Sequence, residues 1–110
     1  MSVQYRQGDV LLIKVSEAEA STLRLRERAR PIKGRLILAH GEATGHTHSI
    51  DGATASLHEL RFGERHLTVW APTELTHEEH APIRLDPGFY RVIRQREFVP
   101  TRDTDAWVRD

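Results

Sequence analysis

Short apolar runs separated by turn-forming residues recur along the whole chain. The runs are rich in β-branched and aliphatic residues, and glycine, proline or aspartate stands between them, a pattern that is typical of β-strands. It predicts strands at residues 9–15, 35–40, 45–50, 54–62, 65–71, 74–79 and 89–99, the last being the longest. Because side chains two positions apart on a strand face the same way, Tyr90, Val92 and Arg94 are expected on one face.

Residues 16–31 carry a mixed signal. Ser16 followed by Glu19 matches a helix capping box, which predicts a short helix near residues 17–22. An extended segment is expected to follow and to end before Pro31. Arginine recurs there at every second position, which on a strand would make one basic face. These residues are Arg24, Arg26, Arg28 and Arg30.

Turn signals divide the predicted strands. Asp51-Gly52 is typical of a tight hairpin turn, and residues 86–88 place proline and glycine where turns favour them. The predicted strands at 54–62 and 65–71 are expected to pair around Gly63-Glu64. The chain of 110 residues is the size of one domain, and no linker or repeat interrupts it. We therefore predict a single all-β domain over residues 1–110. Its expected form is a small antiparallel β barrel or sandwich of the cupin or jelly-roll kind, with at most one short helix.

Charge is balanced in this chain, with Lys+Arg 16 against Asp+Glu 16. A balanced charge argues against a strong nonspecific nucleic-acid binder, which usually carries a basic excess. The absence of cysteine excludes disulfides, thiolate metal sites and cysteine nucleophiles. No apolar run is long enough to span a bilayer, and the N-terminus lacks the layout of a signal peptide. We therefore expect a cytoplasmic protein without membrane contact.

Candidate chemistry is concentrated in two histidine-rich segments. All seven histidines lie between residues 40 and 80, and HGEATGHTHS at 40–49 and THEEH at 76–80 contain most of them beside glutamates. Neutral imidazole and carboxylate are the groups that hold zinc, iron, manganese or nickel in proteins. Imidazole also transfers protons near neutral pH. If the protein has a chemical site, it is expected in these two segments.

His46 and His48 are the strongest candidate metal ligands. On one strand they would stand on the same face, about 7 Å apart at the backbone. Both rings could then reach one ion at about 2.0–2.1 Å. A third ligand is expected from His77 or His80, and only one of them would join unless a turn at 78–80 brings both round. Three glutamates are candidates to complete the shell or to act as general base: Glu42, Glu78 and Glu79. The remaining histidines are interpreted as structural residues: His40, His58 and His66.

The segment GEATGHTH, followed downstream by a further histidine, resembles the two metal-binding motifs of cupins. The resemblance implies a jelly roll that holds one metal ion through His46, His48 and either His77 or His80. A glutamate that cupins carry shortly after the histidine pair is missing here. Over a longer stretch, HGEATGHTH with HEEHAPIRLDPGFYRVIRQREF resembles an uncharacterised family of small bacterial and phage proteins, to which no activity is attached.

A second spacing resembles the metal-binding signature of JAMM-type metalloproteases. It comprises His46, His48, Ser56 and Glu59. That fold needs the serine to begin a helix, whereas residues 53–62 follow a β pattern behind a turn signal. We interpret this spacing as coincidence.

Three functions remain open from the sequence. The first is a metal-binding β protein with one divalent transition ion, which as an enzyme would activate water or O₂ with Glu78, Glu79 or Glu42 as base. The second is a noncatalytic accessory or protein-binding module, phage- or operon-encoded. The third is metal-free histidine and glutamate chemistry on a phosphodiester, or RNA binding, with the arginine run holding phosphate. The ligand would be a small molecule or a protein. The apolar pair Trp107-Val108 in a polar tail predicts a contact with the body or with a second subunit of a homodimer.

Overall fold

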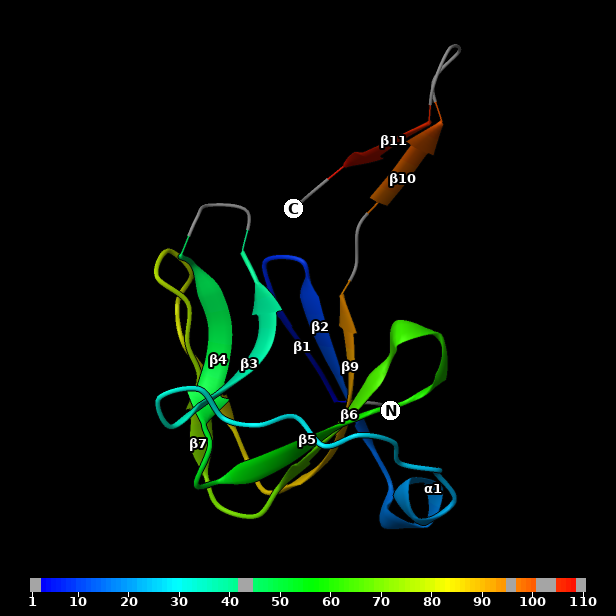
Figure 1. Cartoon of the computed structure of the whole chain (residues 1–110), viewed down its shortest axis with the longest axis vertical. Helices are drawn as coiled ribbons and strands as arrows, with labels where there is room; N and C mark the ends of the chain where they lie inside the picture. Colours follow the sequence, from blue (N-terminus) through cyan, green and yellow to red (C-terminus); the bar gives the residue numbers. More distant parts are fainter. Residues whose placement is uncertain (1–2, 42–44, 95–96, 101–104, 109–110) are drawn as a thin grey trace.

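One antiparallel sheet of five strands forms the larger layer of the fold (Figure 1). The computed structural model describes residues 3–41, 45–94, 97–100 and 105–108. The strands follow the spatial order β1-β2-β9-β6-β5, and every neighbouring pair is antiparallel. Their bounds are β1 Gln4–Gln7, β2 Val10–Val15, β9 Gly88–Arg94, β6 Arg65–Val69 and β5 Ala55–Glu59. The centre of this sheet therefore joins the beginning of the chain to its last third.

Two further strand pairs form the opposite layer. β3 pairs with β4, and β7 pairs with β8. Their bounds are β3 Arg35–His40, β4 Thr47–Asp51, β7 Thr73–Leu75 and β8 Ile83–Leu85. A bridge joins the two pairs, because Ser49 and Thr76 exchange backbone hydrogen bonds of 3.0 and 2.9 Å. In Figure 1, β3, β4 and β7 lie on one side of the molecule, and β1, β2 and β9 lie on the other.

The core lies between these layers and is built from alternate strand positions. In β9, Tyr90 and Val92 are buried, so the predicted shared face of these two residues is confirmed. Tyr90 donates its hydroxyl to the backbone carbonyl of Asp86 at 2.6 Å, which satisfies the polar end of a fully buried ring. Burial raises the pKa of Tyr90 to about 12. The other fully buried large aliphatic side chains are Leu12, Leu36, Leu38, Ile50, Leu57, Leu67, Leu75 and Leu85.

The short helix α1 (Glu17–Ser21) forms where the capping box predicts it. The Ser16 side chain accepts a hydrogen bond from the Glu19 amide at 3.0 Å. The chain then runs extended along β5, with the amides of Arg26 and Ala29 donating to backbone carbonyls of that strand. The arginine run is therefore an extended segment at the sheet edge and not a regular strand.

The prediction of a small antiparallel all-β fold with one short helix is confirmed. Among the described residues, the strand pairing does not close into a barrel, so the arrangement is that of two facing layers. The predicted pairing of residues 54–62 with 65–71 is confirmed by β5 and β6. The predicted hairpin at Asp51-Gly52 is wrong, because β4 pairs with β3 and not with β5. A turn signal describes only the local backbone, and the free edge of β4 is occupied by Thr76.

Several strand limits differ from those the pattern predicts. β5 ends early and a short 3-10 helix (η1, Arg61–Gly63) follows it. The expected strand at 74–79 is confined to β7, and residues 78–80 form a bend instead. β1 and β8 were not expected, because QYRQ is mostly polar and IRL is only three residues long.

The expected long strand at 89–99 is divided into β9 and β10 (Glu97–Pro100), and β10 pairs with β11 (Asp105–Val108). This pair projects away from the two layers in Figure 1. Within the described residues, we find no helix with the length and apolar character needed to cross a membrane.

Candidate functional site

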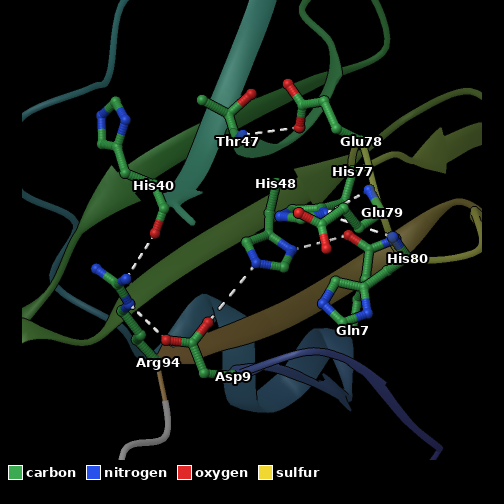
Figure 2. Close-up of polar contacts among 10 residues, drawn as sticks. All are labelled: Gln7, Asp9, His40, Thr47, His48, His77, Glu78, Glu79, His80 and Arg94. Atoms are coloured by element: carbon green, nitrogen blue, oxygen red, sulfur yellow. Dashed lines mark hydrogen bonds and ion pairs between the residues drawn. The ribbon is translucent and has the colours of Figure 1, made fainter. Parts of the chain in front are cut away.

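Three connecting segments meet at one end of the layers and bring histidines together (Figure 2). The turn between β1 and β2 contributes Gly8 and Asp9, the approach to β4 contributes His46, and the segment after β7 contributes residues 77–80. His48 lies within β4 and is almost completely buried beside them. The site is thus built from residues far apart in the sequence.

Four imidazole rings form one cluster around His77. The centroid of the His77 ring lies 4.4 Å from that of His48 and 4.6 Å from that of His80. It lies 5.5 Å from the centroid of His46. The bend at residues 78–80 turns both His77 and His80 toward β4. Of the two alternatives that the sequence left open, the structure therefore has the one in which both histidines of THEEH reach the site.

His48 is held in one orientation by Gln7. The Nδ1 atom of His48 lies 2.9 Å from Oε1 of Gln7. The amide nitrogen of Gln7 donates to the carbonyls of Leu75 and Ala81, each at 3.0 Å, so its oxygen is left to face the ring. His48 Nδ1 is therefore the donor, and the lone pair of the neutral ring lies on Nε2.

The surroundings of His48 keep its ring neutral. Burial, together with the neighbouring His77, lowers the pKa of His48 to about 4. Asp9 acts in the opposite direction, since its Oδ1 lies 3.6 Å from Nε2 of His48. The ring is thus uncharged at pH 7, the state in which imidazole binds metal ions.

Asp9 is fixed from its other side by Arg94. The Nε atom of Arg94 donates to Oδ2 of Asp9 at 2.8 Å, and its Nη2 donates to the backbone carbonyl of His40 at 2.6 Å. Figure 2 shows the His40 ring pointing away from the cluster. His40 contributes to the site through its backbone alone.

Two glutamates border the cluster on the side of His46. Glu79 places Oε1 3.0 Å from Nδ1 of His46. A carboxylate at that distance holds the ring proton on Nδ1 and leaves the Nε2 lone pair for another partner. Glu78 accepts a hydrogen bond from the Thr47 amide at 3.0 Å, and this bond lowers the pKa of Glu78.

One group in this cluster has the spacing of a metal site. His46, His77 and Glu78 each offer one ligand atom, and these atoms lie within 4.8 Å of one another. Ligand atoms at about 2.0–2.2 Å from one tetrahedral ion stand roughly 3.3 Å apart, so a small inward movement would suffice. In the structure, Nδ1 of His77 accepts from the amides of Glu79 and His80 at 3.0 and 3.4 Å. Neutral His77 therefore carries its proton on Nε2.

Glycine is needed where two backbone segments touch the rings. Gly8 has a φ of +59°, and a Cβ there would lie 2.9 Å from Nε2 of His80 and 3.2 Å from Cε1 of His48. A Cβ at Gly41 would lie 2.9 Å from Nε2 of His77. A side chain at either position would displace an imidazole.

The predicted ligands all lie at this cluster, with one change in their arrangement. β4 begins at Thr47, so His46 directly precedes the strand that contains His48 instead of lying within it. The rings of both His46 and His48 contact the ring of His77. Glu42 lies outside the described residues.

The hydrophobic pattern missed three residues that support the site: Gln7, Asp9 and Arg94. Gln7 and Asp9 are buried although they are polar, at 2% and 5% exposure. Polar residues on both sides of Gly8, directly before an apolar strand, are the signal that could have drawn attention to them.

His58 and His66 form a separate pair. They stand opposite each other on β5 and β6, and they were expected to be unrelated structural residues. Within the described part of the chain, the Nδ1 atoms of both are buried without a hydrogen-bond partner. Burial lowers the pKa of His66, and His58 lowers it further.

Fold and site together define a small all-β protein with a cluster of histidines and carboxylates. A family model described as Domain of unknown function (DUF8820) matches residues 6–95, and the chain belongs to this family. The match runs from the end of β1 to the end of β9 and includes the whole cluster. No curated protein and no solved structure matches the chain. The resemblance to an uncharacterised family is confirmed at the level of the family, and the cupin resemblance stays a prediction.

Proposed function

We propose that the protein binds one divalent transition metal ion through His46, His77 and Glu78. The observation that carries this proposal is the spacing of their ligand atoms, all within 4.8 Å of one another. Both histidines are partly buried and Glu78 is exposed, so an ion has access from solvent. The other rings of the cluster, His48 and His80, are close enough to complete the coordination after small movements.

The ligand set favours a site of the catalytic kind. Two imidazoles and one carboxylate leave coordination positions for water or a substrate, and they suit zinc, iron, manganese or nickel. When bound, such an ion supplies Lewis-acid activation of the molecule in the open position. The contact between Glu79 and His46 supports an orienting role for Glu79, because a carboxylate on Nδ1 directs Nε2 toward an ion.

His77 is the ligand that must rearrange on binding. Its Nδ1 lone pair is taken by the amides of Glu79 and His80. Coordination through Nδ1 displaces these amides, and coordination through Nε2 requires the ring proton to move to Nδ1, where the amides leave no acceptor. Either route opens the bend at residues 78–80, so the amide resonances of Glu79 and His80 should shift when the ion binds.

Metal analysis and calorimetry test the proposal directly. Purified protein, first stripped with a chelator, is titrated with Zn²⁺, Ni²⁺, Mn²⁺ and, without oxygen, Fe²⁺. We expect one ion per chain for at least one of these metals. His46→Ala and His77→Ala should each weaken binding by about 100-fold or more, since even residues that only orient a ligand contribute about 10–100-fold.

His40→Ala is the matched control, because the His40 ring points away from the cluster (Figure 2). It should bind the ion as the wild type does. Absence of saturable binding for all four metals, or equal binding by His46→Ala and the wild type, would contradict the proposal. The protein-binding module and the metal-free phosphodiester chemistry stay predictions from the sequence.

A further inference from the structure

A cleft with basic residues at an otherwise largely apolar wall lies near the histidine cluster, beyond Asp9 and Arg94. It has a volume of about 360 Å³ and lies between β3 and the ends of β6 and β9. Three arginines line it, Arg30, Arg65 and Arg94, and no aspartate or glutamate is among its lining residues. The function proposed above does not use this cleft.

The arginines reach the cleft from separate elements. Arg65 is the first residue of β6 and Arg94 is the last residue of β9. Both lie on the face of the sheet that carries the core residues. Arg30 comes from the extended segment before β3. The apolar inner face therefore ends in guanidinium groups at this end of the molecule.

Two of these guanidinium groups have no hydrogen-bonded or ion-paired partner among the described residues. Within the described residues, neither Arg30 nor Arg65 makes an ion pair or a side-chain hydrogen bond. Arg65 is only partly exposed, and burial lowers its pKa. Glu59 raises that pKa from the neighbouring strand, and Arg94 lowers it. A half-buried guanidinium without a bonded anion is costly unless a ligand supplies one.

Arg94 is the fixed member of the set. Its contacts with Asp9 and with the His40 carbonyl hold the plane of the guanidinium at the edge of the cleft. Arginine presents parallel N–H donors that match the oxygens of phosphate and carboxylate. Asp9 pairs with Arg94, Glu59 lies opposite Arg65 on the neighbouring strand, and neither carboxylate lines the cleft.

We propose that this cleft binds the oxyanion of a small molecule, a phosphate or carboxylate group held by Arg30, Arg65 and Arg94. Asp9 connects this position to the cluster, since one of its oxygens contacts Arg94 and the other faces His48. The bound molecule is thereby placed beside the histidines. The inference concerns the chain's own arginines and holds whether or not a metal ion binds.

The test follows the arginine side chains by NMR in chelator-treated protein. Inorganic phosphate and acetate are titrated separately while the Nε–H resonances of Arg65 and Arg94 are monitored. We expect saturable shifts with at least one anion. Tighter binding of phosphate assigns a phosphate-bearing ligand, and tighter binding of acetate assigns a carboxylate-bearing one.

Variants separate this site from general charge effects. Arg65→Gln and the exposed Arg30→Gln should each lower the affinity about tenfold, the loss expected for one charge-assisted contact. Arg84→Gln, an exposed change on β8 that removes the same charge, should leave it unchanged. Arg30→Gln covers the case in which Arg65→Gln fails to fold.

The same titration distinguishes failure of this proposal from failure of the metal site. His46→Ala should bind the anion normally, because His46 is not among the residues that line the cleft. The inference is overturned if no saturable shift appears, if Arg84→Gln weakens binding as much as Arg30→Gln, or if binding disappears in His46→Ala.

Discussion

His48 and Gln7 stand 41 positions apart in the sequence and share a buried hydrogen bond of 2.9 Å from Nδ1 to Oε1. The bond fixes the ring proton of His48 on Nδ1. The amide nitrogen of Gln7 already donates to two backbone carbonyls, so its oxygen must accept from the ring. The bond also joins the first strand of the larger layer to the second strand of the opposite one. One side chain therefore both connects the two layers and orients the site.

Removing this side chain should be costly. Gln7→Ala leaves the carbonyls of Leu75 and Ala81 without their donor and the Nδ1 of His48 without its acceptor. We expect a loss of about 3 kcal/mol in the free energy of unfolding, since each buried polar group left unsatisfied costs about 1–3 kcal/mol. Urea denaturation measures the loss. Gln4→Ala, an exposed change on the same strand, should cost little, and equal losses would contradict the role of Gln7.

The effect of the close contact between Gly8 and the imidazole rings can be separated from backbone strain by comparison with a second glycine, Gly34. Gly8→Ala and Gly34→Ala both place a side chain on a backbone with positive φ, +59° and +79°, but only at Gly8 would the new Cβ meet imidazoles. We expect about 1–2 kcal/mol of destabilisation for Gly34→Ala from the backbone alone. Gly8→Ala should cost more and should also shift the ring resonances of His48 and His80. Identical losses and unchanged ring resonances would show that the rings tolerate the methyl group.

Stability should fall as the solution becomes acidic, partly because of His48. Its pKa is about 4 in the folded protein and 6.5 in an ordinary histidine, so the unfolded chain binds the proton first. Between these values protonation favours unfolding, and the free energy of unfolding should drop by on the order of 3 kcal/mol from this group.

Comparison with His48→Asn measures the part of the acid-induced loss of stability that is due to His48, because asparagine keeps a donor near the position of Nδ1 and does not titrate. Denaturation of metal-free protein at pH 7, 6, 5 and 4 should show a steeper fall for the wild type than for His48→Asn. Parallel curves would contradict a depressed pKa for His48.

The pair of His58 and His66 predicts a stabilising substitution. His66 is 2% exposed, and its Nδ1 has no hydrogen-bond partner among the described residues. His66→Leu removes this unsatisfied group at similar volume, at the expense of a 3.2 Å contact with Thr68. Because the pKa of His66 is lowered, protonation below its ordinary range destabilises the fold, and the variant escapes that effect.

We therefore expect His66→Leu to gain more stability relative to the wild type at pH 5 than at pH 8. Melting temperatures at the two pH values are sufficient to see the difference. Thr68→Ala is the control, because it removes the same 3.2 Å contact and keeps the imidazole. A gain that is independent of pH would contradict the lowered pKa.

Local patterns in the sequence predict the class of fold and identify the residues with candidate chemistry. Alternation along a strand is a local property, so the shared face of Tyr90 and Val92 could be predicted from their spacing alone. The capping box of Ser16 and Glu19 is local too, and the helix begins where it predicts. The ligand types were visible because His46, His48, His77 and His80 carry their chemistry in the side chain.

Tertiary structure decided which strands pair and how the histidines meet. The turn signal at Asp51-Gly52 could not reveal that β4 pairs with β3 and not with β5, because pairing depends on which edges are free in the folded molecule. The bend at residues 78–80 brings both histidines of THEEH to one place, and the β1–β2 turn brings Gln7 and Asp9 to them. These contacts join positions far apart in the chain, and burial of the core between two layers is what holds them together.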